Sequence, residues 1–170
     1  MKTVVILFAD RKSKTEKEII EILTLFGANY ISDKTVCSLE GAFTVVSEYK
    51  SIDLKINDGI AVICDITDRF KNQSFPKGII GICEDTNIKA LNLFLKNHTP
   101  VISCGMNGKN TISLSSLDNN IPFITLQRQI TDLKGNIIEP AEFKIGLENR
   151  YSPFSVMASV TILLLEGQLP

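Results

Sequence analysis

Two acidic residues, Glu84 and Asp85, follow a short apolar run in the middle of the sequence. The run, residues 78–83, has the composition of a buried parallel strand, and Asn87 stands where a helix would begin. Ligand sites in open α/β sheets lie just past such strand ends, where two carboxylates could hold Mg²⁺ or a substrate hydroxyl. Acidic side chains at a helix start also complement the helix dipole, so a structural role explains the pair equally well.

A second group of residues, Gly105, Asn107 and Lys109, lies in a glycine-containing segment after the next apolar run. A phosphate-binding loop has the pattern G-x-x-x-x-G-K-[ST], in which N–H groups and a helix start surround the phosphates. Here Asn110 follows the lysine, no glycine stands five positions before Gly108, and the next residues alternate like a strand. The sequence therefore favours a glycine turn between strands over a phosphate-binding loop.

Asp10 and Asp65 also come directly after apolar runs. If these strands are parallel, both side chains share one rim with the acidic pair, although exposed ion pairs would explain them as well. The expected ligand-binding residues are therefore Glu84, Asp85, Asn87, Gly105, Asn107, Lys109, Asp10 and Asp65. We assign no catalytic residue and no metal ligand.

Histidine and cysteine give little support for catalysis. The one histidine, His98, lies in a polar segment between a helix and a strand, which favours a solvated loop residue over a catalytic dyad. The four cysteines contain no C-x-x-C pair, so a disulfide framework or zinc site is not expected. Buried strand-end thiols are the main expectation, and an exposed Cys104 beside Gly105 is the alternative.

Composition limits the partners of the protein. The net charge is −1 and charged residues make up 22% of the chain, so no basic excess favours nucleic acid. The apolar run near the N-terminus spans about six residues and is followed by Asp10, which predicts a first strand rather than a signal peptide. No apolar stretch approaches the roughly 20 residues that span a bilayer, so we expect a soluble cytoplasmic protein with no membrane partner.

The pattern of elements predicts one α/β domain over residues 1–170, with a Rossmann-like, three-layer, mostly parallel sheet. Strands are expected at residues 3–9, 58–65, 78–83 and 101–104, antiparallel strands from 111 to 147, and a closing helix at 155–166. A capping box of Ser13 and Glu16 would start the first helix, and Gly27 would end it. A helix at 87–97 would turn Ile88, Leu91, Phe94 and Leu95 inward. Residues 29–54 predict an added antiparallel β-hairpin region, as an insertion or a sheet edge.

The order of GICED, VISCG and RYSPFSVMASVTILLLEG resembles the ATP-binding central domain of the Mur ligases and their folylpolyglutamate synthase relatives. In that family an N-x-D-D strand end, a helix, a strand ending in glycine, antiparallel strands and a closing helix follow one another. The resemblance covers residues 58–170. It implies a peptidoglycan-related α/β scaffold in which Glu84 and Asp85 match the acidic pair, with ATP and Mg²⁺ as the cofactors that such a pair would accommodate.

The departures from the family pattern decide the expected function. Gly81 stands where the family has an asparagine near the adenine, and FADRKSKTE after the first strand contains neither glycine nor G-K-[ST]. We therefore expect a pseudoenzyme with no obligatory cofactor, a binding or regulatory module for a protein partner or a small-molecule ligand. One alternative is a transferase or ligase that holds a nucleotide or phosphometabolite with Glu84, Asp85 and Lys109. Another is a homo-oligomeric structural protein that pairs through residues 35–54.

Overall fold

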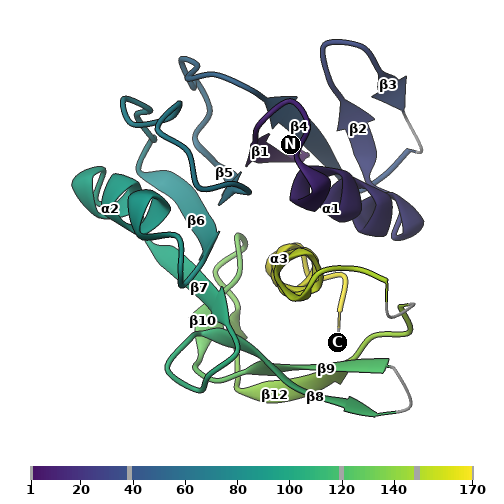
Figure 1. The fold of residues 1–170 in the computed structure, drawn as a ribbon. Coiled ribbons are helices and arrows are strands. Elements are labelled where there is room, and N and C mark those ends of the chain that lie inside the picture. The colour runs from purple at the N-terminus through teal and green to yellow at the C-terminus, as the bar shows by residue number, and fades with distance from the viewer. Residues whose placement is uncertain (1, 38–39, 119–120, 148–149, 170) are drawn as a thin grey trace.

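The computed structural model describes residues 2–37, 40–118, 121–147 and 150–169 (Figure 1). Its helices are α1 (Lys14–Leu25), α2 (Ile88–Lys96) and α3 (Pro153–Leu165). Its strands are β1 (Thr3–Phe8), β2 (Asn29–Ile31), β3 (Val36–Cys37), β4 (Phe43–Glu48), β5 (Asp58–Ile63), β6 (Gly78–Glu84), β7 (Val101–Gly105), β8 (Ile112–Asp118), β9 (Ile121–Leu126), β10 (Ile130–Thr131), β11 (Ile137–Ile138) and β12 (Ala141–Lys144).

The described residues form one large sheet in the order β12-β9-β8-β7-β6-β5-β1-β4-β2-β3. The neighbours from β8 to β2 pair in parallel, while β9, β12 and β3 are antiparallel to their neighbours at the two ends. A separate hairpin is made by β10 and β11. The protein is thus an α/β protein with a mostly parallel central sheet and added antiparallel strands, as the sequence predicts.

Helices cover both faces of the sheet. Along β1, Val5 and Leu7 enter the core under α1 and α3, whereas Ile6 and Phe8 enter the core under α2. The sheet curves around α3, so this helix is buried nearly all round (Figure 1). That position explains why its sequence is apolar on every side. None of the described helices is long and apolar enough to cross a membrane.

Helix α2 is rotated relative to the sequence prediction. Phe94 is buried as expected, together with Ala90 and Leu93. Ile88 and Leu95, also expected to point inward, are 59% and 74% exposed. The reason lies in β6, where a Cβ on Gly81 would come within 2.7 Å of the Phe94 ring. Gly81 lets Phe94 pack directly on the strand, and this contact sets the rotation of the helix.

The hairpin expected at residues 29–54 is shorter than predicted. Among the described residues of this segment, only β2 and β3 form an antiparallel pair, at the edge of the sheet. The prediction is wrong for Phe43–Glu48, which is the interior strand β4 and pairs in parallel with both β1 and β2. Alternating burial along β4 fits either direction of pairing, so the sequence pattern could not distinguish the two arrangements.

Candidate functional site

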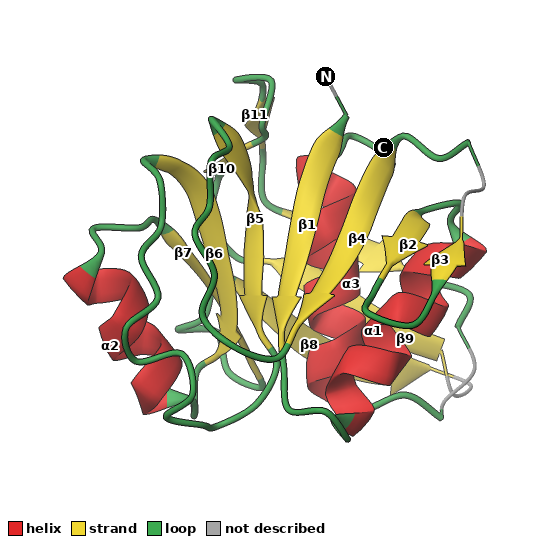
Figure 2. Cartoon of the chain, turned by 90° about the horizontal axis from the view of Figure 1, so that it is seen from above, coloured by secondary structure: helices red, strands yellow, loops and turns green. Residues whose placement is uncertain are grey.

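The carboxyl ends of β1, β4, β5, β6 and β7 meet at one edge of the parallel sheet, the carboxyl edge (Figure 2). Strand β1 leads through α1 toward β2 on one side, whereas β5, β6 and β7 follow on the other side. The direction of winding therefore changes between β1 and β5. Ligands of open α/β sheets bind at such a crevice, so the predicted site residues lie where a site is expected.

Asp65 connects the loops at this change of direction. Its Oδ2 accepts a 2.8 Å hydrogen bond from the backbone N–H of Asp10, and its Oδ1 accepts a 3.0 Å bond from Ser13 Oγ. Asn87 Nδ2 donates to the backbone carbonyl of Asp65 at 3.1 Å. The structure thus brings the predicted residues Asp10, Asp65 and Asn87 together. The carboxylate of Asp65 thus accepts hydrogen bonds from two donors of the loop between β1 and α1, Asp10 N and Ser13 Oγ.

The first turn of α1 confirms half of the capping box. The backbone N–H of Glu16 donates to Ser13 Oγ at 3.1 Å, but the N–H of Ser13 donates to the carbonyl of Asp10 at 2.9 Å. Glu16 instead points inward and is 3% exposed. Burial raises its pKa, hydrogen bonds with Ser47 and Tyr49 lower it in part, and the charge of Asp65 adds to the increase. A largely buried acid therefore lies directly beneath the carboxyl edge.

A second group of predicted residues is tied together at the end of β6. Asn110 Nδ2 donates to Asp85 Oδ2 at 2.8 Å, and Asn107 Nδ2 donates to the same oxygen at 3.4 Å. Gly105 makes room for this contact, because a Cβ there would overlap both Asp85 Oδ2 and Asn110 Nδ2. Asn110 is 4% exposed, and its mismatch with a phosphate-binding loop was the only feature noted for it in the sequence.

The remaining two predicted residues contact these groups through their backbones, and the N–H of Lys109 donates to Asn107 Oδ1 at 3.0 Å. Glu84, the last residue of β6, is half-buried, and its backbone carbonyl accepts from the N–H of Asn87 at 3.0 Å. Lys109 is exposed, and its carbonyl accepts a 2.7 Å bond from Arg128. The segment after Lys109 continues as strand β8, as expected, so no helix dipole points at this loop.

A polar pocket of about 590 Å³ opens at the carboxyl edge beside β4, and we call it the arginine pocket. Arg11 lies over the ring of Tyr49 at 5.0 Å and pairs with Asp33 at 3.1 Å. Arg69 lines the same pocket and pairs with Asp10 at 3.1 Å. Burial, together with the nearby charge of Glu16, raises the pKa of Tyr49 to about 12, so its hydroxyl stays protonated and can donate a hydrogen bond.

Sequence reasoning missed the arginine pocket. Its wall includes Ser47, Glu48 and Tyr49, which fall in the segment expected to be an inserted hairpin. Placing β4 next to β1 brings these residues to the carboxyl edge. The polar run Ser47-Glu48-Tyr49 at the end of an alternating strand is the one signal that pointed to this edge.

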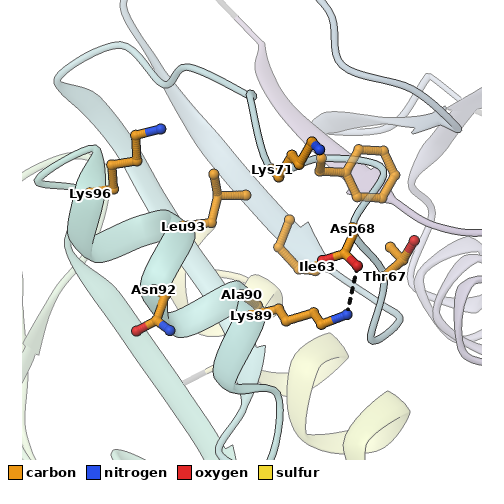
Figure 3. Close-up of a pocket in the computed structure, with 10 residues that line it drawn as sticks. Ile63, Thr67, Asp68, Lys71, Lys89, Ala90, Asn92, Leu93 and Lys96 are labelled. Carbon is orange, nitrogen blue, oxygen red and sulfur yellow. Dashed lines mark hydrogen bonds and ion pairs between the residues drawn. The ribbon is translucent and has the colours of Figure 1, made fainter.

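A smaller hollow of about 240 Å³ lies on the other side of the loop that follows β5 (Figure 3). Leu93 of α2 and Ile63 of β5 form its apolar floor, with Lys71 and Lys96 at its sides. Lys89 Nζ pairs with Asp68 Oδ2 at 2.9 Å. The volume is below the roughly 300–1,000 Å³ typical of ligand pockets, so the arginine pocket is the larger candidate at this edge.

The cysteine thiols have no exposed position at the carboxyl edge. Cys64, Cys83 and Cys104 are buried and free, and burial is the largest cause that raises the pKa of each, to about 12 for Cys83. The alternative of an exposed Cys104 is wrong, because its side chain is fully buried near Thr161 on α3. Among the described residues, no group of three or more histidine, cysteine or acidic side chains could hold a metal ion.

Neither a scan against protein-family models nor a search of curated proteins found a match.

Proposed function

We propose that this protein is a binding module without ligase activity, on a scaffold that resembles the Mur ligase central domain, and that it binds a small anionic ligand at the carboxyl edge. The observation that carries the proposal is the position of Asp65. Its carboxylate accepts from Asp10 N and Ser13 Oγ in the loop between β1 and α1, where an ATP-binding domain holds phosphate.

The position of Asp65 argues against phosphate binding in two ways. A phosphate would need the same donors that the carboxylate uses, and it would meet a negative charge within hydrogen-bond distance of them. The loop also lacks the glycines that let successive backbone N–H groups converge on a phosphate. Phosphoryl transfer depends on electrostatic positioning of the γ-phosphate, and the described loop supplies little of it.

The arginine pocket supports binding of an anion beside this closed loop. Arg11 and Arg69 each use part of the guanidinium on one aspartate, at 3.1 Å, and a guanidinium carries five donors. The remaining donors fit the geometry of a carboxylate or a phosphate group. The hydroxyl groups of Tyr49 and Ser47 already bond Glu16, so the two arginines supply the ligand contacts. A small polar metabolite with one or two acidic groups fits this lining.

The enzyme alternative has less support. It needs Glu84, Asp85 and Lys109 to act together on a nucleotide. Asp85 is already held by Asn107 and Asn110, and no ion pair joins Lys109 to either acid among the described residues. The oligomer alternative would use the edge strand β3, which in the described part of the chain offers a pairing edge of two residues, Val36–Cys37. Such a short edge supports little strand pairing between copies.

Calorimetric titration tests the proposal. We would titrate the protein with ATP, with and without Mg²⁺, and with UDP-linked sugars, inorganic phosphate and succinate. We expect no Mg²⁺-dependent heat with ATP, and binding of an anionic probe that weakens about tenfold in Arg11→Ala and in Arg69→Ala. Lys96→Ala, a cation in the neighbouring hollow, is the matched control and should bind as the wild type does.

Two results would count against the proposal. Binding of ATP that requires Mg²⁺ and is lost in Glu84→Ala would place the enzyme alternative first. Anion binding that is the same in both arginine variants and in the wild type would remove the arginine pocket as the site.

A further inference from the structure

A third hollow lies at the opposite edge of the sheet, where β5, β6 and β7 begin. We call it the amino-edge pocket. It has a volume of about 620 Å³, within the roughly 300–1,000 Å³ of ligand pockets. Its lining includes the starts of β6 and β7 and the segment that leads from β9 into β10. In Figures 1 and 2, β10 lies beside the amino ends of these strands. None of the residues predicted as site residues lines it.

The pocket exists because β8 does not cover the first half of β7. Strand β7 begins at Val101, but its register with β8 begins at Cys104, which pairs with Ile112. After β9 the chain runs back past the uncovered part of β7 as residues 128–133 and forms the β10–β11 hairpin. The N–H of Leu133 lies 3.4 Å from the carbonyl of Leu165, which holds the hairpin near the end of α3.

Aliphatic side chains make up the walls of the amino-edge pocket. Ile80 and Ile102 come from the sheet, and Ile130 and Leu133 come from the hairpin side. All four pack against the core around α3, and three of them (Ile80, Ile130 and Leu133) are only partly buried. The partly exposed apolar surface would be covered by an apolar ligand, and its removal from water would stabilise the complex.

Two cations lie at the pocket without an acidic partner. Lys77 and Arg128 line it, and neither forms an ion pair among the described residues. Arg128 Nη2 donates to the carbonyl of Lys109 at 2.7 Å, which positions the guanidinium and leaves its other donors for a ligand.

The acidic side chains in the lining do not neutralise these cations. Asp132 accepts from the N–H groups of Lys134 and Asn136, at 2.8 and 2.7 Å, and from Asn136 Nδ2 at 2.8 Å. Its carboxylate is thus engaged within its own turn. Asp58 is the other acidic lining residue, and it is exposed at the start of β5. Among the charged groups in the lining, the available hydrogen-bond donors therefore belong to Lys77 and Arg128.

We propose that the amino-edge pocket is a second ligand site, separate from the arginine pocket, and that it takes a small molecule with an apolar body and one carboxylate group. The four aliphatic side chains contact the apolar body. Lys77 and Arg128 bind the carboxylate at the mouth, where a guanidinium can make two parallel hydrogen bonds.

Titration calorimetry with 2-naphthoate and with decanoate tests this site. The first probe has a rigid apolar body and the second a flexible one, and both carry one carboxylate. We expect at least one of them to bind, and the affinity to fall about tenfold in Lys77→Ala and in Arg128→Gln. 1-Naphthylmethylamine, with the opposite charge, should not bind. Leu133→Asn should also weaken binding, because it places an amide in the apolar wall.

The controls separate this proposal from the proposed function. Arg11→Ala and Arg69→Ala should bind the two carboxylates as the wild type does, because they change the other edge of the sheet. Lys77 and Arg128 are exposed, so their variants should unfold at the wild-type urea concentration. The proposal is overturned if neither carboxylate binds, if the amine binds equally well, or if affinity is unchanged in both cation variants.

Discussion

At the carboxyl edge of the sheet, the carboxylates of Asp65 and Asp85 are held by donors from neighbouring loops, at distances of 2.8–3.4 Å. At the amino edge, Lys77 and Arg128 form no ion pair in the described part of the chain, and aliphatic walls are partly exposed. The acidic side chains of the first edge fix loops, whereas the second edge leaves cationic and apolar groups available for a ligand. The comparison indicates that acidic residues at strand ends form a ligand site only where neighbouring loops do not already donate hydrogen bonds to their carboxylates.

The largest effect on stability is expected for Gly105→Ala, which tests this difference at the carboxyl edge. The added Cβ would overlap Asp85 Oδ2 and Asn110 Nδ2, so the hydrogen bond between these buried and half-buried groups must break. We expect the free energy of unfolding to fall by about 2–3 kcal/mol. Urea denaturation measures it. Gly108→Ala is the matched control: the nearest atom, Gln127 Oε1, is 4.0 Å away, so a change below about 0.5 kcal/mol is expected.

Equally small losses of unfolding free energy in Gly105→Ala and Gly108→Ala would contradict this account. They would mean that the loop tolerates displacement of Asp85 and that the cluster does not hold the carboxyl edge.

Asp65→Ala should have the next largest effect. The variant leaves Asp10 N and Ser13 Oγ without their acceptor, which we expect to cost about 2 kcal/mol of unfolding free energy. Asp65→Asn keeps one acceptor oxygen and should lose about half as much. Asp68→Ala removes only an exposed pair with Lys89, so its change should stay within about 0.5 kcal/mol. Thermal and urea unfolding of the three variants would show whether this order holds.

Asp132→Ala tests the amino edge in the same way. We expect a smaller loss of unfolding free energy, about 1 kcal/mol. Asp132 binds donors within four residues of itself, and those donors can reach water when the side chain is removed. Lys134→Ala is the control, because it keeps the backbone N–H that donates to Asp132 and removes only the nearby positive charge. Hydrogen exchange should show faster exchange in the β10–β11 hairpin of Asp132→Ala and little change elsewhere. Faster exchange throughout the sheet would show that the hairpin supports the whole fold.

The sequence predicted most of the elements, for physical reasons that hold locally. Buried runs such as residues 58–63 and 101–105 became parallel strands, and Ser13 and Asn87 cap α1 and α2. Capping and strand burial depend on neighbours in the sequence. The antiparallel pairing of β8 with β9, and of β10 with β11 around Gly135, was also predicted from alternation and turn residues.

What the sequence could not predict depends on contacts between distant segments. The parallel insertion of β4 between β1 and β2 has no local signal, because alternation is the same for both directions. The rotation of α2 follows from the fit of Phe94 on Gly81, 13 residues away in the sequence. The candidate site shows the same limit. The sequence placed its acids on one edge correctly, but the amides of Asn107 and Asn110 that engage Asp85 were visible only in the structure.

The smallest expected effect concerns the pH dependence of stability, and it sharpens the contrast between Glu16 and Asp132. Burial raises the pKa of Glu16, whereas in Asp132 the bonds from Asn136 and Lys134 outweigh burial and lower the pKa. A raised pKa in the folded state gives stability below the unfolded value of 4.5, and this stability is lost as the pH rises through the folded value. A lowered pKa acts in the opposite direction, with stability lost as the pH falls below about 3.8.

Glu16→Gln should therefore remove a loss of stability that the wild type undergoes as the pH rises from 4.5. Urea unfolding at intervals from pH 4.5 to 7.5 would give the unfolding free energy of each protein as a function of pH. The stability of Glu16→Gln relative to the wild type should increase toward neutral pH. Tyr49→Phe should enlarge the loss and extend it to higher pH, because it removes a hydrogen bond that favours the ionised carboxylate. Parallel curves for wild type and Glu16→Gln would mean that water reaches this carboxylate, and that the carboxyl edge is more open than its hydrogen bonds indicate.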